Sequence, residues 1–272
     1  MIACPASVVA TGDYAPGAIA IRRVDLPPLT SEVEDFVEAK WRREVKLNPR
    51  LYAGAILSPA AIHISTDRIE IDCGVSDYRQ FMGTTWPEVP EPLRRRALGQ
   101  LAVIVTSDER LVVGVRSKDI DWGGLRAVIP GGRVQPDEGT PEEAILIEFR
   151  EEAGIGPDEI ESLRCVGVLE DRTSGRQNYE IVYLARIGCS ASELVDRASS
   201  AEHSFEHDRI EVYAWEQGTI ADLLSSDPRR FTPSGFGGIA LALRHAFGAD
   251  AFPEWQSEPV TYEEYMGAPA SL

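Results

Sequence analysis

Three glutamates, Glu148, Glu151 and Glu152, lie within the short segment IEFREEAG. On a helix, residues three and four positions apart share one face, so the three carboxylates point the same way. Carboxylates this close repel one another and raise each other's pKa unless a cation neutralises them. A hard divalent ion such as Mg²⁺ takes oxygen ligands and favours substrates that carry phosphates. The spacing therefore predicts a metal site for phosphate chemistry, and a solvated, acid-rich helix face is the alternative.

Two adjacent glycines precede this helix and extend the prediction from metal binding to a reaction. Gly131 and Gly132 permit a sharp turn between a strand and the helix, so the loop backbone can approach the carboxylates. A metal ion there would polarise phosphate oxygens and lower the pKa of a bound water, and a carboxylate would accept the proton. The pattern indicates water attack on a phosphoanhydride. Glu148, Glu151 and Glu152 are the candidate catalytic residues and metal ligands, with Glu148 as the base, and both glycines are candidate substrate contacts.

The whole segment from residue 129 to residue 157 resembles the Nudix box, G-x5-E-x7-R-E-U-x-E-E-x-G-U, where U is a bulky apolar residue. This resemblance implies a divalent metal cofactor, Mg²⁺ with Mn²⁺ as the alternative. The positions that match in order are Gly132, Glu138, Glu148, Phe149, Glu151, Glu152, Gly154 and Ile155.

The segment departs from that box at two places. Eight residues, not seven, separate Glu138 from the R-E position, with Gly139 as the extra one, and Ile147 stands where the family has arginine. The resemblance implies that this arginine orients the glutamates and that Glu138 ties the loop to the helix. All three metal-binding carboxylates survive, which argues against simple decay. We expect Ile147→Arg to be neutral or harmful, because an isoleucine here is expected to pack against neighbouring structure and a buried, unpaired arginine is costly.

Segments outside the box narrow the resemblance to one group. KWRREVKLNPRLYAGAILSPAAIHIS (residues 40–65) and SDYRQFMGTTW (residues 76–86) look like the amino-terminal region of animal Nudix hydrolases that cleave UDP-glucose and UDP-galactose. VRSKDIDWGGLRAVIPGG (residues 115–132) and EDRTSGR (residues 170–176) also look like that group. The resemblance covers most of residues 38–247. It implies the splitting of a UDP-hexose into UMP and hexose 1-phosphate.

Three side chains outside the box are candidate substrate contacts. Arg79 is placed to reach the diphosphate or the uridine, and an ion pair at a domain interface is the alternative. Arg116 closes a predicted strand before a variable loop, where a phosphate clamp would be useful; a surface arginine is the alternative. Tyr78 would stack on uracil, although burial in the core is the expectation for at least two of Tyr78, Phe81 and Trp86.

The segment AEHSFEHD, residues 201–208, carries a second group of metal-binding residue types. His203 and His207 are four apart, a zinc-binding spacing on a helix, but the segment lies between predicted strands and is expected to be a loop. In Nudix proteins a loop at this place often supplies another carboxylate, so the resemblance makes Glu206 a candidate further metal ligand. A solvated loop is the alternative, and the pattern favours it.

The helices and strands that carry these residues are predicted from the spacing of apolar residues and from capping and helix-ending residues. Apolar residues at helical spacing predict a helix that Ser31 caps, with Glu34 completing a capping box. Thr140 and Pro141 predict the start of the glutamate helix, and Gly154 predicts its end. The remaining expected elements are strands in 16–26, 60–73, 101–117, 125–130, 162–171, 179–187 and 209–216 and a helix over 235–247, while 76–86 shows no clear period.

This order of elements and the resemblance together predict an α/β protein of two domains. Residues 1–95 form an amino-terminal α+β domain, and residues 96–250 form the Nudix α/β/α mixed-sheet sandwich. Three prolines after residue 86 mark the expected boundary. Residues 251–272 form a carboxy-terminal tail that is expected to be loosely held.

Composition limits the partners of the chain. The 272 residues carry a net charge of −17, which repels phosphate backbones and disfavours binding to nucleic acid. The four cysteines lie far apart with no C-x-x-C pair, which indicates free thiols. The first residues lack the basic and apolar regions of a signal peptide, and no uncharged stretch is long enough for a membrane span. We therefore expect a cytoplasmic protein, and a homodimer stays open.

The function expected from the sequence is Mg²⁺-dependent hydrolysis of a nucleoside diphosphate sugar, with UDP-glucose or UDP-galactose first. One alternative is a Nudix hydrolase of another nucleoside diphosphate, such as ADP-ribose. The other is a nucleotide-sugar sensor that lost turnover together with the arginine of the box.

Overall fold

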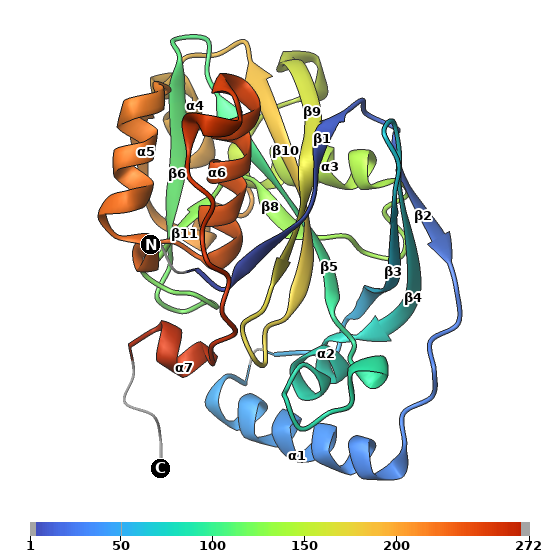
Figure 1. Ribbon diagram of the computed structural model, residues 1–272. Coiled ribbons are helices and arrows are strands. Elements are labelled where there is room, and N and C mark those ends of the chain that lie inside the picture. Colours follow the sequence, from blue (N-terminus) through green and yellow to red (C-terminus); the bar gives the residue numbers. More distant parts are fainter. Residues whose placement is uncertain (1–3, 50, 268–272) are drawn as a thin grey trace.

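The structure, a computed structural model, describes residues 4–49 and 51–267. Its main feature is an eight-stranded mixed sheet in the order β1-β9-β10-β5-β6-β11, with β7 paired to β6 and β8 to β5 (Figure 1). Strands β10 and β5 run parallel, and the other pairs are antiparallel. The strands are β1 (Ala6–Tyr14), β5 (Ala97–Val105), β6 (Arg110–Arg116), β7 (Arg126–Val128), β8 (Gly131–Arg133), β9 (Ile160–Asp171), β10 (Asn178–Ile187) and β11 (His207–Ala214).

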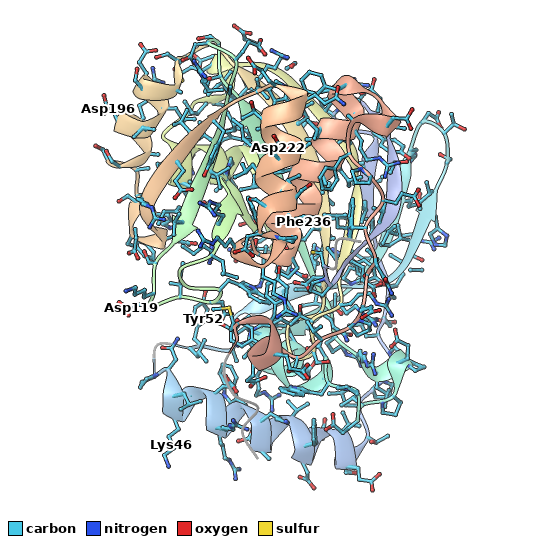
Figure 2. All side chains as sticks on the ribbon, turned by 60° about the vertical axis from the view of Figure 1, so that its left-hand side comes forward. Lys46, Tyr52, Asp119, Asp196, Asp222 and Phe236 are labelled. Atoms are coloured by element: carbon cyan, nitrogen blue, oxygen red, sulfur yellow. The ribbon has the colours of Figure 1, made fainter. Side chains whose placement is uncertain are left out.

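Helices cover both faces of this sheet, because apolar side chains of β5 point alternately to the two faces and each face needs a cover. Leu98 and Ala102 pack into one core with Phe149 of α3 (Pro141–Ala153), and α4 (Ala191–Ala198) contributes to the same core. Leu101 and Val103 point the other way and pack against α5 (Gln217–Ser226) and α6 (Pro233–Phe247). Phe236 of α6 is turned inward, whereas Lys46 and Asp196 lie on outer helix surfaces (Figure 2). The expected α/β fold with a mixed-sheet sandwich is confirmed.

A second, three-stranded sheet in the order β2-β4-β3 lies beside the first. It contains β2 (Ile19–Arg23), β3 (Ala55–Ile64) and β4 (Ile69–Asp77), so the hairpin expected within residues 60–73 is confirmed. Helices α1 (Ser31–Leu47) and α2 (Tyr78–Thr84) pack together near it (Figure 1). One expectation is wrong here: Thr30, not Ser31, caps α1 by accepting a hydrogen bond from the Val33 N–H. Residues 76–86, for which the sequence shows no clear period, contain the short helix α2.

The two ends of the chain pack against the large sheet and its loops. Strand β1 was not expected from the sequence, and it pairs with β9, more than 150 residues away. The Trp255 indole N–H donates to the Ala6 carbonyl at 2.7 Å, and the Ser174 N–H donates to the Val260 carbonyl at 2.8 Å. Tyr265, in α7 (Tyr262–Tyr265), is buried. The expectation of a loosely held tail is therefore wrong for residues 251–267, while residues 268–272 lie outside the described part.

The division at residue 95 stays a prediction, because β1 places part of the first 95 residues in the large sheet. Short 3-10 helices complete the chain and include η3 (Ser204–Glu206). All four cysteines are buried free thiols, as expected. No helix in the described ranges has the length and apolar character needed to span a membrane.

Candidate active site

Helix α3 begins and ends where the sequence predicts. The Thr140 hydroxyl accepts from the Glu143 N–H at 3.2 Å, and the Glu143 carboxylate accepts from the Thr140 N–H at 2.8 Å. Gly154 ends the helix at φ 65°, a conformation that suits glycine. Ile145 and Phe149 anchor the apolar side of α3 in the core. This packing fixes the helix rotation and turns Glu148 and Glu152 toward the β8 turn and Glu151 toward His203.

Glu152 is the most buried of the three glutamates, with 3% of its surface exposed. Its Oε1 accepts a hydrogen bond from the Gly131 N–H at 3.3 Å, and its Oε2 lies 3.2 Å from the Nε2 of His207. Burial raises the pKa of its carboxyl group, and the nearby charge of Glu206 adds to the effect. Both carboxylate oxygens are therefore held in place by groups from other elements.

Glu148 lies against the Gly-Gly turn. A Cβ atom added at Gly132 would lie 1.8 Å from Glu148 Oε1, so only glycine allows this approach. Burial raises the pKa of Glu148, and the charges of Glu152, Glu138 and Glu151 raise it further. No hydrogen bond from another described residue offsets this repulsion. The carboxylate is thus left for a cation, a water or a substrate proton.

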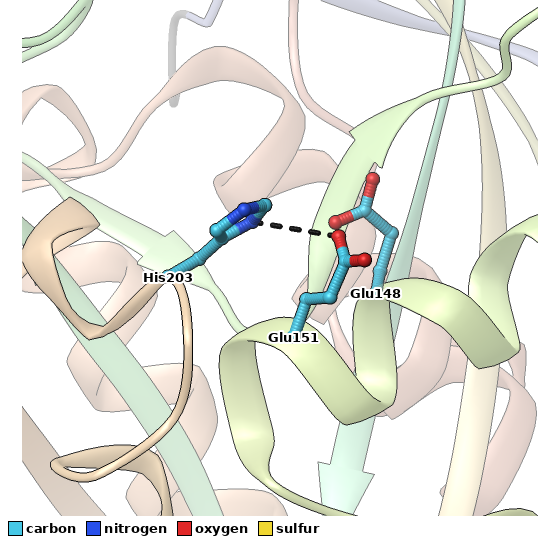
Figure 3. A group of neighbouring side chains, drawn as sticks. All are labelled: Glu148, Glu151 and His203. Atoms are coloured by element: carbon cyan, nitrogen blue, oxygen red, sulfur yellow. Dashed lines mark ion pairs between the residues drawn. The ribbon is translucent and has the colours of Figure 1, made fainter.

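Glu151 meets a histidine that sequence reasoning set aside. Figure 3 shows the imidazole of His203 facing Glu151, with Glu148 alongside. His203 Nδ1 lies 3.6 Å from Glu151 Oε2, and one ligand atom from each of the three side chains lies within 4.8 Å of the others. The segment was expected to be a loop, and it contains a short 3-10 helix and no α-helix. The two histidines therefore do not share one face: His203 lies beside Glu151 and His207 beside Glu152.

Glu206 and Arg116 lie beside the cluster as a pair. Arg116 Nη1 is 3.4 Å from Glu206 Oε2, and its Nε donates to the Asp121 carbonyl at 2.8 Å. Glu206 contributes to the raised pKa of both Glu148 and Glu152, which places its charge near the site. The roles of Glu206 as a metal ligand and of Arg116 as a phosphate clamp stay predictions.

The two departures from the box have separate structural consequences. The extra residue Gly139 has φ 82° in the turn before the helix cap. Glu138 accepts a hydrogen bond from the Gln135 N–H at 2.8 Å, so this contact closes the loop on itself, and the link to the helix stays a prediction. Ile147 is partly exposed and lies outside the buried core. The expectation that Ile147→Arg is neutral or harmful therefore stays a prediction.

The tyrosine and arginine expected to bind substrate have different surroundings. Tyr78 is buried, and its hydroxyl donates to the Asp121 carboxylate at 3.1 Å. Arg79 pairs with Glu38 at 3.4 Å and with Asp77 at 3.6 Å, both in the amino-terminal region. Their roles in substrate binding stay predictions.

Sequence reasoning missed Arg133, which directly follows the Gly-Gly pair. Its side chain is exposed, and its guanidinium lies 4.5 Å from the centre of the Tyr78 ring. None of the ion pairs found among the described residues includes it. An exposed, unpaired arginine beside the glycine turn is a typical phosphate contact. The position of Arg133 directly after two glycines could have indicated this role from the sequence.

His207 is expected to position Glu152 through one nitrogen. Burial lowers the pKa of His207 to about 4, so the ring is neutral, and its Nε2 lies within hydrogen-bond distance of Glu152 Oε2. A Cβ at Gly114 would lie 2.4 Å from the Nδ1, so the ring fits tightly. His207→Gln places an amide N–H near the Nε2 position, whereas His207→Asn reaches only the Nδ1 position.

We expect His207→Asn to lower kcat about tenfold or more, as for other outer-shell partners of metal ligands, and His207→Gln to keep most of it. Steady-state kinetics and thermal unfolding of both variants provide the check. Equal losses in the two variants would show that His207 only fills space.

The raised carboxyl pKa values predict how stability of the metal-free protein depends on pH. Burial raises the pKa of Glu148 to about 8 from an ordinary value of 4.5, and Glu152 shifts in the same direction. Between these pH values the unfolded chain has lost protons that the folded protein still holds, so stability falls as pH rises from about 4.5 to about 8.

A divalent ion that binds the ionised carboxylates would reverse this loss. We expect Mg²⁺ to raise the melting temperature more at pH 8 than at pH 5. Thermal unfolding with and without Mg²⁺ at both pH values measures the difference. An equal Mg²⁺ effect at the two pH values would count against clustered, mutually repelling carboxylates.

Comparison with known proteins gives one family match. The family model described as NUDIX domain matches residues 95–234. No curated protein matches the chain. The Nudix domain of Shewanella oneidensis NrtR, solved with ADP ribose, is 14% identical, with a TM-score of 0.41, and the match covers 59% of this chain and 94% of that one.

Two further solved structures show a similar degree of likeness. The MutT protein from Methanosarcina mazei Go1 is 18% identical, with a TM-score of 0.38, over 55% of this chain and 94% of that one. A bifunctional NMN adenylyltransferase/ADP ribose pyrophosphatase from Francisella tularensis, solved with AMP and a Mn ion, is 16% identical, with a TM-score of 0.38, over 55% of this chain and 42% of that one.

Proposed function

Because this chain belongs to the Nudix family and is a hydrolase of pyrophosphate bonds, we propose that its substrate is a nucleoside diphosphate sugar, UDP-glucose or UDP-galactose first. The products would be UMP and hexose 1-phosphate. The observation that carries the reaction is the approach of Glu148 and Glu152 to the Gly131–Gly132 turn, with Glu151 beside Glu148.

The donor set fits the divalent ion that Nudix enzymes use. Glu148 and Glu151 present carboxylate oxygens close together, and Glu148 has no protein hydrogen bond to offset its charge. We propose that these two side chains and Glu152 hold Mg²⁺, with Mn²⁺ as the alternative and Glu206 as a further candidate ligand. Such an ion would neutralise the carboxylates and polarise the phosphate oxygens.

The chain's own residues take distinct parts in the proposed reaction. Glu148 accepts a proton from the attacking water, since its carboxylate has no competing donor. Glu152 is held in one rotamer by Gly131 and His207. Arg133, exposed beside the turn, binds the diphosphate with the backbone of Gly131 and Gly132.

Support for a UDP-sugar comes from three segments that the resemblance singles out. Tyr78 belongs to SDYRQF, Asp121 to VRSKDIDW and Arg176 to EDRTSGR, and the three side chains meet. Asp121 accepts from the Tyr78 hydroxyl at 3.1 Å and from Arg176 at 3.3 Å. Arg133 also reaches the Tyr78 hydroxyl, at 3.4 Å. The segments that resemble those of UDP-sugar hydrolases thus form one network that touches the proposed diphosphate contact.

A panel of nucleotide sugars tests the substrate. We expect kcat/KM for UDP-glucose or UDP-galactose to exceed that for ADP-ribose and GDP-mannose, with products identified by chromatography. Higher kcat/KM for ADP-ribose would move the chain to the alternative hydrolase. Tight binding of UDP-glucose without products would make the protein a sensor.

Replacing Arg133 tests the proposed diphosphate contact. A hydrogen bond to a charged group contributes about 1.5–3 kcal/mol, so Arg133→Ala is expected to raise KM for the nucleotide sugar about 10- to 100-fold. Arg110→Ala, which removes another exposed arginine at the far end of β6, is the matched control. An unchanged KM in Arg133→Ala would remove this residue from the substrate site.

A further inference from the structure

His203 gives the metal site a nitrogen donor that the Nudix box does not contain. The backbone fixes its position, because the His203 N–H donates to the Glu151 carbonyl at 2.8 Å. The following residues are held as well, since the Ser117 N–H donates to the Glu206 carbonyl at 2.8 Å and the Ser117 hydroxyl donates to the Phe205 carbonyl at 2.6 Å. The imidazole is therefore delivered by an ordered segment that packs on α3.

The imidazole faces the carboxylates at a spacing that suits a shared ion. His203 Nδ1 and Glu151 Oε2 are 3.6 Å apart, too long for a strong hydrogen bond. Two adjacent ligands of one octahedral ion, each about 2.1 Å from it, lie about 3 Å apart. The ligand atoms of Glu148, Glu151 and His203 all fall within 4.8 Å of one another. Figure 3 shows the imidazole and the two carboxylates next to one another, as ligands of one ion would have to be.

The chemistry of this donor set points to a class of ion. Mg²⁺ favours oxygen ligands and keeps several waters, so an imidazole adds little to its binding. Ions such as Co²⁺, Fe²⁺ and Zn²⁺ accept imidazole nitrogen together with carboxylates. A site with two carboxylates and one imidazole therefore distinguishes the two classes.

We propose that His203 is a metal ligand of the active site and that, through its Nδ1, the site binds imidazole-accepting divalent ions of the Co²⁺ class in addition to Mg²⁺. This inference rests on the proposed function for the location of the metal and goes beyond it in naming a ligand and an ion class. His207 does not share this role, since its Nε2 is directed to Glu152 and its Nδ1 lies against Gly114.

The test measures Co²⁺ and Mg²⁺ binding to the full chain by isothermal titration calorimetry, without substrate. Tighter binding of Co²⁺ than of Mg²⁺ by the wild type does not test the proposal, because most sites share this preference. The test is the change in Co²⁺ affinity when His203 is replaced. We expect His203→Gln to weaken Co²⁺ binding at least about tenfold, a loss of about 1.4 kcal/mol, while Mg²⁺ binding changes less than about twofold.

The matched control is His245→Gln, because the His245 side chain has a similar exposed fraction, 27% against 33%, and lies near Asp13, which is not among the candidate metal ligands. Unchanged Co²⁺ affinity in a folded His203→Gln variant would overturn the proposal. Proton NMR of the Co²⁺-loaded protein is a second readout. A paramagnetically shifted imidazole signal that is present in the wild type and lost in His203→Gln supports ligation by His203, and the absence of such a signal from the wild type contradicts it.

The proposal and the proposed function fail in different ways. If the wild type hydrolyses nucleotide sugars while Co²⁺ affinity is unchanged in His203→Gln, only the metal inference is wrong. If Co²⁺ binding depends on His203 while no nucleotide sugar is hydrolysed, the metal inference stands and the proposed substrate is wrong.

Discussion

Glu152→Gln is expected to lower kcat about 100- to 1000-fold while leaving the fold intact, a loss within the range of single acid or base groups. The wild-type side chain has both oxygens held, by the Gly131 N–H and by His207. Glutamine cannot ionise, so the negative charge that the metal ion would require at this position is lost. The check is steady-state kinetics beside circular dichroism and thermal unfolding.

The same substitution is expected to leave the melting temperature of the metal-free protein unchanged or higher. Burial raises the pKa of Glu152, so the folded metal-free protein holds this group largely neutral, as glutamine is. Addition of Mg²⁺ should then stabilise the variant less than the wild type. Glu142→Gln, in the first turn of the same helix, is the matched control. Near-normal kinetics, or loss of the helical signal, would contradict the role assigned to Glu152.

Removal of divalent ions by EDTA is expected to reduce turnover to background, and excess Mg²⁺ or Mn²⁺ should restore it. The reason is electrostatic: the charges of Glu138, Glu151, Glu152 and Glu206 all act to raise the pKa of Glu148, and the described residues supply no compensating hydrogen bond. An equal concentration of EDTA already saturated with Mg²⁺ is the control for effects of the chelator itself. Full activity in excess EDTA would end the metal mechanism.

Local sequence patterns predicted the glutamate helix closely. Thr140, Pro141 and Gly154 mark its bounds as expected, because caps and helix-ending glycines act through neighbouring backbone groups. The same reasoning placed the α1 cap one residue late. Thr30 and Ser31 are adjacent hydroxyl residues, and the choice between them depends on how the chain enters the helix. Local patterns cannot fix that direction.

Contacts between distant segments escaped prediction. The sequence of β1 has no clear strand pattern, and the strand forms by pairing with β9. The tail around Trp255 is held by a hydrogen bond to Ala6 of β1. The short helix α2 gained its place from Tyr78 and Phe81, which pack into a core shared with β3 and β5. Such elements depend on partners that no local window contains.

In the candidate site too, local spacing predicted some of the contacts and the path of the chain determined the others. The shared face of Glu148, Glu151 and Glu152 follows from helical spacing alone. The approach of His203 and His207 to different glutamates depends on the path of the chain between α4 and β11, where a 3-10 helix separates the two histidines. Sequence spacing treated them as a pair, and the fold assigns them to separate neighbours.

Hydrolysis of UDP-glucose in water labelled with oxygen-18, followed by phosphorus NMR and mass spectrometry, tests the proposed reaction directly. We expect equal amounts of UMP and glucose 1-phosphate, one of them carrying a single label, with Mg²⁺ required and with Glu152→Gln nearly inactive. Formation of UDP and glucose, or binding of UDP-glucose without any cleavage, would contradict it.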